Sequence, residues 1–294
     1  MSKHAYMILA HHRPDLLQLL INALDDKRND IVIHIDKKSD MSPDQFYCNH
    51  ANMIFIDRIE VNWGGYTQVE CEYKLMKEAV KLGKHSYYHL LTGVNYPLWN
   101  QDYIHSFFEE KNGKEFIGFD YDADYTLRVK YYVPFPEYGK LHGLTGRLVQ
   151  LSRNIVKIAQ DAFHIDFRNR TTYTIKKGCA YFSITENLVN LIISKESEMK
   201  GLLEHTICCD EIFVQTIAYN SEFKDNIYNI ADEFDGCLRE LAWPSNLGKE
   251  RPGWNFWLED LEYLLNSHRL FAMKFESEDG IDLINQIRAR RKIS

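Results

Sequence analysis

The sequence predicts an α/β fold in which a mostly parallel, twisted sheet is covered by helices on both faces. Short apolar runs typical of buried strands alternate with segments in which apolar residues recur every three or four positions, and this alternation indicates a parallel sheet. No linker rich in Pro, Gly or Ser divides the 294 residues. We therefore expect one large domain over residues 1–276 and a basic helical tail over residues 277–294.

The apolar pattern places the individual elements along the chain. We expect strands at 5–10, 31–36, 53–56, 87–91 and 178–184, and helices at 15–25, 67–82, 102–109, from 185 and from 210. The helix over 67–82 is expected to open with a capping box formed by Thr67 and Glu70. Open parallel sheets bind ligands at the carboxyl ends of their strands, so the segments directly after the strands should form the site.

A cationic amphipathic helix is expected over residues 144–158. Arg147, Arg153 and Lys157 lie around the helix, and the apolar residues share one side. Those apolar residues are Leu144, Leu148, Leu151, Ile155 and Ile158. We expect this side to pack against the core while the cations are solvated, and contact with an anionic membrane surface is the alternative.

Composition and charge exclude some classes of protein. Lys and Arg number 35 and Asp and Glu number 42, and the resulting net charge of −7 argues against a nucleic-acid partner. The 18 tyrosines, in a chain that is 13% aromatic, suit a surface that stacks on sugar rings and a nucleobase, or else a Tyr-rich core. The six cysteines show neither metal-ligand spacing nor a disulfide framework, so we expect free thiols.

The sequence favours a cytoplasmic location. The apolar run AYMILA near the amino terminus is too short for a signal peptide, and no later run reaches the ~18 apolar residues of a membrane span. Free thiols fit the same reducing compartment. From this side the protein could touch the inner face of a membrane as a peripheral protein.

The most informative residues are Asp210 and Glu211, which follow two adjacent cysteines and open an apolar run, together with Arg251 and Lys274. A carboxylate can activate an acceptor hydroxyl, and two spaced cations can hold a pyrophosphate leaving group. The set therefore describes sugar transfer from a nucleotide sugar without a metal. Taken singly, Glu211 could be an acid favoured near a helix N-terminus, and each cation could be a solvated surface residue.

Seven stretches in order carry a resemblance to a known family. They are AYMILAHHRPDLLQLLINAL, IVIHIDKKS, VNWGGYTQVE, HLLTGVNYPL, GCAYFSIT, CCDEIFVQT and RPGWNF…HRLFAMKF, between about residues 5 and 275. This set resembles the core-2/I-branching β-1,6-N-acetylglucosaminyltransferase family, which includes the peptide O-xylosyltransferases. The resemblance implies a GT-A-like fold, a UDP-sugar donor, inversion at the anomeric carbon, and neither metal nor cofactor. It also implies that Glu211 is the general base and that Arg251 and Lys274 bind the UDP pyrophosphate.

The resemblance assigns further residues around the donor and the acceptor. Ala10, Asp36 and Trp63 would contact the uridine, although Asp36 could instead cap a turn and Trp63 could fill the core. Candidates for the sugar sites are Thr92, Gly93, Asn95, Asp210, Trp243 and Arg128. Trp243 would stack on the apolar face of a pyranose. Arg128 is assigned only from its position near a basic stretch of the family.

Two other interpretations stay open. Asp120, Asp122 and Asp124 form two overlapping Asp-x-Asp triplets, the pattern that holds the metal ion of metal-dependent transferases. We favour a solvated acidic loop over this alternative. A carbohydrate- or nucleotide-binding protein without chemistry would also suit the many aromatic residues, but it would not need a base opposite a leaving group.

The expected acceptor follows from segments that the sequence lacks. Animal members of the family have a membrane anchor, a stem and many disulfides, and none of these is recognisable here. We therefore expect a bacterial, cytosolic member that acts on a glycan or lipid-linked oligosaccharide of a surface polysaccharide. N-acetylglucosamine is the favoured donor sugar, with xylose, glucose and galactose left open.

Overall fold

A six-stranded sheet forms the centre of the computed structural model, which describes residues 3–121, 126–139, 143–248 and 254–293. The strands are, in spatial order, β3 (Asn52–Phe55), β2 (Asn29–Ile35), β1 (His4–Ala10), β4 (Tyr87–Thr92), β7 (Phe182–Thr185) and β6 (Phe116–Ile117). The first four are parallel to one another, whereas β7 is antiparallel to both β4 and β6. The prediction of a mostly parallel α/β sheet is confirmed.

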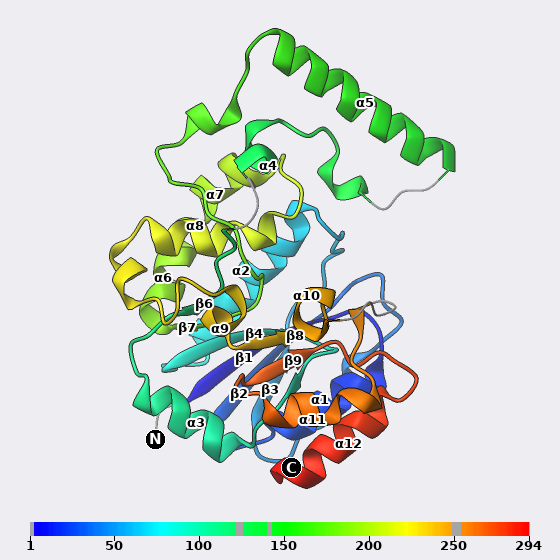
Figure 1. Ribbon diagram of the computed structural model, residues 1–294, viewed down its shortest axis with the longest axis vertical. Helices are drawn as coiled ribbons and strands as arrows, with labels where there is room; N and C mark the ends of the chain where they lie inside the picture. Colours follow the sequence, from blue (N-terminus) through cyan, green and yellow to red (C-terminus); the bar gives the residue numbers. More distant parts are fainter. Residues whose placement is uncertain (1–2, 122–125, 140–142, 249–253, 294) are drawn as a thin grey trace.

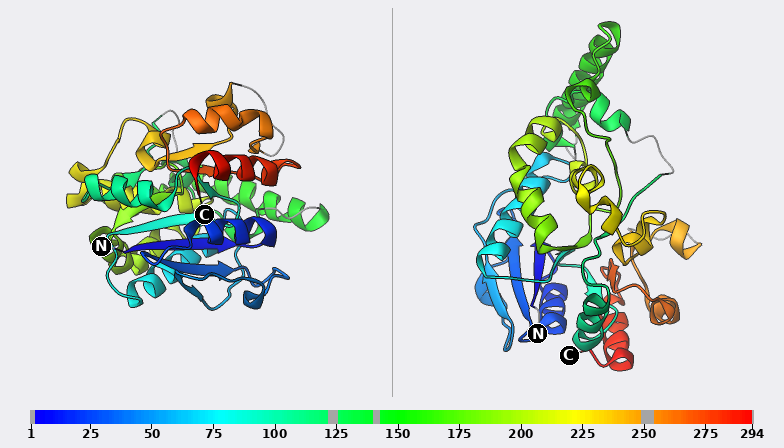
Figure 2. Two further views of the ribbon diagram at one scale, coloured as in Figure 1. Left: turned by 90° about the horizontal axis from the view of Figure 1, so that it is seen from below. Right: turned by 90° about the vertical axis from the view of Figure 1, so that its left-hand side faces the viewer.

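Helices cover both faces of this sheet (Figure 1, Figure 2). Side chains of β1 alternate between two apolar clusters, so that Tyr6 and Ile8 face one side and Ala5 and Met7 the other. The first cluster is closed by α1 (Pro14–Leu24) and α3 (Gln101–Glu110). The second is closed by α2 (Tyr66–Lys81), α6 (Glu186–Ser194), α7 (Glu196–Leu203) and α8 (Phe213–Tyr219).

A smaller sheet contains β5 (Tyr96–Pro97), β9 (Phe271–Met273) and β8 (Arg239–Leu241), in that order. Beside it lie α11 (Leu261–Asn266) and α12 (Gly280–Arg291). Leu283 and Ile287 of α12 are buried in the same apolar cluster as Ala272 of β9. The carboxyl-terminal helix therefore packs on the fold through its apolar side, and the domain division at residue 276 stays a prediction.

Short helices occupy most of the remaining connections. They are η1 (Pro43–Gln45), α4 (Thr126–Lys130), η2 (Pro136–Tyr138), η3 (Phe167–Arg170), η4 (Cys209–Glu211), η5 (Glu222–Asn226), α9 (Glu233–Cys237), α10 (Pro244–Leu247) and η7 (Leu258–Asp260). The exception in length is α5 (Gly143–Ala162), which lies far from the six-stranded sheet at one end of the molecule (Figure 1).

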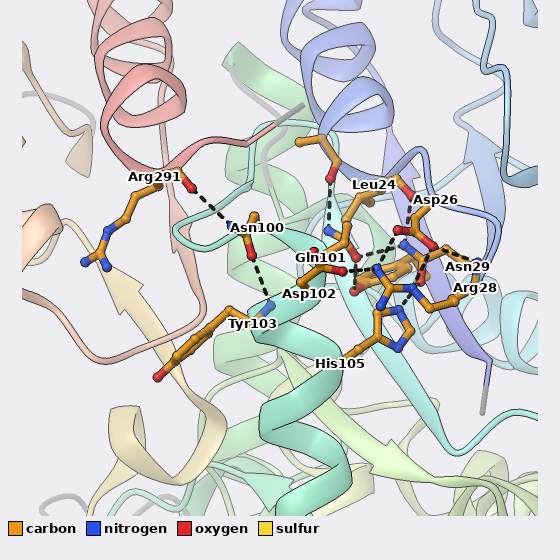
Figure 3. A network of polar contacts seen from close by, with 12 residues as sticks. Leu24, Asp26, Arg28, Asn29, Asn100, Gln101, Asp102, Tyr103, His105 and Arg291 are labelled. Atoms are coloured by element: carbon orange, nitrogen blue, oxygen red, sulfur yellow. Dashed lines mark hydrogen bonds and ion pairs between the residues drawn. The ribbon is translucent and has the colours of Figure 1, made fainter. Parts of the chain in front are cut away.

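A polar network holds α3 against the turn before β2 and against the end of α12 (Figure 3). The amide of Asn29 donates to Gln101 over 2.8 Å, and its oxygen is 2.8 Å from Nε2 of His105. Burial lowers the pKa of His105 to about 4, so the ring is neutral at pH 7. The amide of Asn100, the N-cap of α3, donates to the carbonyl of Arg291 over 3.4 Å. These contacts fix α3 beneath the sheet without a role in the site.

Two expectations about local structure are wrong. Helix α2 begins at Tyr66 with Gly65 as its N-cap, so Thr67 cannot form the predicted capping box. The Thr67 hydroxyl instead donates to a carboxylate oxygen of Glu137 over 2.6 Å, a long-range bond that local spacing cannot reveal. The apolar side of α5 is exposed to solvent, whereas we expected it to pack against the core.

The predicted strand at 178–184 begins only at Phe182, because the residues before it make other contacts. A Cβ at Gly178 would lie 1.9 Å from the carbonyl oxygen of Gly118, and the Gly178 N–H donates to the carbonyl of Glu211 over 2.9 Å. The absence of a side chain at Gly178 therefore lets the backbone of Gly118 approach closely, while the Gly178 N–H bonds to the loop that carries Glu211.

We expect Gly178→Ala to destabilise the protein by about 3 kcal/mol, because the added methyl group meets backbone that cannot move aside. Thermal unfolding followed by circular dichroism should show a Tm at least about 5 °C lower. The matched control is Gly201→Ala, since a Cβ there would meet no atom within 4 Å. Its Tm should stay unchanged or rise slightly, because Ala favours helix. Equal losses in both variants would contradict the argument.

Candidate active site

Three predicted residues meet where the parallel strands end. The N–H of Asp36 donates to the carbonyl of Ala10 over 2.8 Å, and the N–H of Gly93 donates to the carbonyl of Leu9 over 2.9 Å. A Cβ at Gly93 would lie 3.2 Å from that of Ala10. The segments after β1, β2 and β4 therefore form one continuous surface, as expected at this edge of an open sheet.

The carboxylate of Asp36 shapes the loop that carries Trp63. Its oxygens accept hydrogen bonds from the backbone N–H groups of Lys38 at 2.8 Å and Val61 at 3.3 Å. Trp63 is 57% exposed. Asp36 therefore does stabilise a turn, as the alternative to uridine contact supposed. Trp63 does not fill the core, because its ring faces solvent.

Thr92 and Asn95 form a second group at the same edge. The side-chain oxygen of Asn95 accepts from the Thr92 N–H over 2.8 Å and is also bonded to the Thr92 hydroxyl. The Asn95 amide nitrogen is buried and has no hydrogen-bond partner among the described residues. The Thr92 hydroxyl is also bonded to Tyr181, whose own hydroxyl lies 2.7 Å from the sulfur of Met273. Tyr181 thereby connects the end of β4 to the end of β9.

Lys274 follows β9 directly and lies beside the segment after β1. Its ammonium nitrogen is 3.6 Å from a carboxylate oxygen of Glu276. The other oxygen of Glu276 is paired with His12, and the guanidinium of Arg13 lies 3.5 Å from the Glu276 carbonyl. Lys274 is therefore at the predicted edge of the sheet. Arg251 lies outside the described residues.

Glu211 is held by two cations from distant parts of the chain. Its carboxylate oxygen Oε2 is 2.6 Å from Nη1 of Arg128 and 3.6 Å from Nζ of Lys177. Lys177 also pairs with Asp120 at 3.0 Å. Although burial opposes it, the carboxylates of Glu211 and Asp120 raise the pKa of Lys177. The two ion pairs fix the orientation of the Glu211 carboxylate. Arg128, a candidate for the sugar sites, thus contacts Glu211 directly.

Sequence reasoning did not identify Lys177 or Glu233. Lys177 directly precedes the stretch GCAYFSIT, and this position is the one feature of the sequence that could have marked it as a candidate. Glu233 begins α9, and burial raises its pKa to about 7 even though Lys177 opposes this shift. Asp120 and Glu211 add to the shift, which places Glu233 in the same electrostatic cluster.

Asp210 points toward α2 and away from these cations. Its Oδ2 accepts from the amide of Gln68 over 3.2 Å, while Oδ1 is buried without a hydrogen-bond partner among the described residues. Burial and the neighbouring Glu211 carboxylate raise the pKa of Asp210 to about 7. Burial and Asp210 also hold the pKa of Glu72, a fully buried residue of α2, well above its ordinary value. The two acids behind Glu211 therefore share a strongly desolvated environment.

Aromatic rings line the side of the site near β8. Trp243 packs edge-on against Phe234, with ring centroids 5.4 Å apart, and lies 6.2 Å from the ring of Trp254. Trp254, in the stretch RPGWNF, is 54% exposed. Trp243 is thus part of an aromatic group. Trp254 also belongs to this group, although the sequence analysis did not name it as a candidate.

One hydrogen bond joins the loop that carries Trp63 to the loop that carries Glu211. The Cys208 N–H donates to the carbonyl of Gly64, next to Trp63, over 2.8 Å. This bond, the bond between Gly178 and Glu211, and the contacts of Tyr181 with Thr92 and Met273 connect the loops that carry described candidate residues. A cavity of about 340 Å³ beside His85, Glu115 and Thr185 lies at the opposite edge of the sheet and is separate from this region.

Two features are absent from the described residues. No helix among them is both long and apolar enough to cross a membrane. In the same part of the chain, no three His, Cys, Asp or Glu side chains come together in a way that could hold a metal ion.

The fold and the site are those of an α/β protein whose candidate residues gather near the carboxyl ends of parallel strands. The model of the Core-2/I-Branching enzyme family matches residues 4–243, and the chain belongs to this family. It is therefore a glycosyltransferase with a GT-A-like fold, a class that takes a nucleotide-sugar donor and a glycan acceptor. A search of curated proteins found no match.

Proposed function

We propose that the protein is a metal-independent, inverting transferase that moves a sugar from UDP to a hydroxyl group of a glycan. The observation that carries this proposal is the Glu211 carboxylate, oriented by Arg128 and Lys177 in the region that also contains Lys274. N-acetylglucosamine is the favoured sugar. A lipid-linked oligosaccharide of a bacterial surface polysaccharide is the favoured acceptor, and the cytoplasm is the favoured location.

In the proposed reaction Glu211 takes the proton from the acceptor hydroxyl as its oxygen attacks the anomeric carbon. The bond between that carbon and the phosphate oxygen breaks, and UDP leaves with the electron pair. Lys274 and Arg251 offset the negative charge that develops on the pyrophosphate. Attack opposite the leaving group inverts the configuration of the sugar.

The remaining candidates divide between the two substrates. Ala10, Asp36 and Trp63 are proposed for the uridine, because they lie around the ends of β1 and β2. Sugar contacts are proposed for the residues near the ends of β4 and β8, with Trp243 stacking on a ring. These are Thr92, Gly93, Asn95 and Trp243. Asp210 is proposed to act near the sugar through Glu211, whose carboxylate helps to raise its pKa.

Pairing of Asp120 supports the metal-independent reaction over the metal-dependent alternative. Its carboxylate is engaged by Lys177 at 3.0 Å, and an ammonium competes with a divalent cation for the same oxygen atoms. Asp122 and Asp124, the other members of the two triplets, lie outside the described residues.

Calorimetric titration of UDP into the protein in EDTA tests the proposal. We expect micromolar binding without metal, followed by turnover of one UDP-sugar in a donor screen that is equal with EDTA and with Mn²⁺. Binding and turnover that appear only with Mn²⁺ would transfer the leaving-group role to the Asp120 segment. Tight UDP binding with no turnover of any donor would favour the non-catalytic binding protein.

A further inference from the structure

Helix α5 contacts the rest of the protein through a narrow side only. Arg153 donates to the carbonyls of Pro134 and Phe135 over 3.2 and 2.6 Å. Near the other end of the helix, the amide of Gln160 exchanges two hydrogen bonds with the backbone of Tyr132. Gln160 is the only residue of α5 with a buried side chain among those described. Polar bonds therefore anchor the helix, and they include one from the Tyr131 hydroxyl to Asp161.

The apolar residues of α5 form an unpartnered stripe. They recur at spacings of four, three, four and three, which places them on one side of a helix. They are Leu144, Leu148, Leu151, Ile155 and Ile158, and each is between 54% and 74% exposed. Phe163, directly after the helix, is 77% exposed. Twenty residues span about 30 Å, so the stripe is long and exposed, and α5 itself lies at one end of the molecule (Figure 2).

The charge around this stripe is opposite to that of the whole chain. Residues 126–170 contain eight Lys and Arg against three Asp and Glu, a net charge of +5, whereas the chain has −7. Two of the three acids are paired within the segment, since Asp161 bonds to Tyr131 and Asp166 pairs with Arg168. Arg147 and Lys157 of α5 are exposed. The positive charge is therefore local to this segment, and Arg147 and Lys157 place part of it on the same helix as the apolar stripe.

We propose that α5 lies along the surface of an anionic phospholipid bilayer, with its Leu and Ile stripe between the lipid headgroups. Exposed apolar residues together with flanking cations fit such a surface, because apolar burial and attraction to anionic lipid add. A second copy of the chain fits less well, since the exposed cations Arg147 and Lys157 of two such helices would face each other. The surface does not include Glu211 or Lys274, so it stands apart from the proposed chemistry.

Flotation with vesicles tests this surface. The full chain should float with vesicles of phosphatidylglycerol and phosphatidylcholine and should stay at the bottom of the gradient with phosphatidylcholine alone. The double variant Leu148→Gln, Ile155→Gln tests the apolar stripe, and the double variant Arg147→Gln, Lys157→Gln tests the charge. Each should bind the anionic vesicles at least about tenfold more weakly. The matched control is Leu258→Gln, an exposed leucine in η7, which should float like the unchanged protein.

Two further measurements keep the outcomes distinct. Circular dichroism and UDP titration should be unchanged in both double variants, because α5 lies outside the site. Absence of the unchanged protein from the floating fraction would overturn the proposal. So would equal binding to neutral vesicles, or a dimer in gel filtration that the Leu148, Ile155 variant dissociates. Failure of UDP binding alone would count against the proposed function and would leave this surface standing.

Discussion

Glu211→Gln should lower the rate of sugar transfer by about 10²- to 10⁴-fold, the range that a positioned general base contributes. The amide has nearly the shape of the carboxylate but cannot accept the proton of the acceptor hydroxyl. Affinity for UDP should change by less than about threefold, because Glu211 is proposed to act on the acceptor and not on the leaving group. Turnover of the UDP-sugar and calorimetric titration of UDP, on the same preparation, provide the two readouts.

The control for this variant is Glu109→Gln, which makes the same chemical change at an exposed position near the end of α3. It should keep the full rate. Loss of the Glu211 carboxylate also leaves Arg128 and Lys177 without that partner, so the Tm of the variant should be measured alongside. A folded Glu211→Gln protein with full turnover would remove Glu211 from the mechanism.

Lys274→Ala should lower turnover by about 100-fold or more, because a fixed cation aimed at developing charge contributes on that scale. The same variant should bind UDP more weakly and uridine equally well, since the ammonium is proposed to contact only the pyrophosphate. Titrations with the two ligands in EDTA separate these effects. Arg251→Ala should behave in the same way.

Lys84→Ala supplies the matched control, because Lys84 is an exposed lysine before β4, at the opposite edge of the sheet. Its affinity for both ligands should be unchanged. Parallel losses of UDP and uridine affinity in Lys274→Ala would indicate a disturbed nucleotide pocket. Unchanged affinity and turnover would exclude Lys274 from leaving-group stabilisation.

Local periodicity was enough to predict the four parallel strands of the central sheet, but it missed β6. The apolar run AYMILA corresponds to β1, and the helix expected at 15–25 is α1, Pro14–Leu24. Where a boundary depends on contacts between distant segments, periodicity failed. The strand expected from Gly178 is delayed to Phe182, because the Gly178 N–H bonds to Glu211 instead of a neighbouring strand.

The candidate site shows the same limit. Sequence patterns placed Ala10, Asp36 and Gly93 after parallel strands, and the sheet then brings them together. No pattern could place Lys177 between Asp120 and Glu211, since that pairing depends on the folded path of three separate segments. For α5 the spacing predicted an amphipathic helix, but spacing does not specify what the apolar side meets.

The hydrogen bond between Cys208 and Gly64 gives the two halves of the proposed reaction a mechanical connection. Gly64 adjoins the tryptophan proposed to meet the base of the nucleotide, and Cys208 lies three residues before Glu211. A displacement of the first loop by the donor would reach the loop of the proposed base through one peptide hydrogen bond. Donor binding and the position of Glu211 would thereby be linked in the proposed reaction.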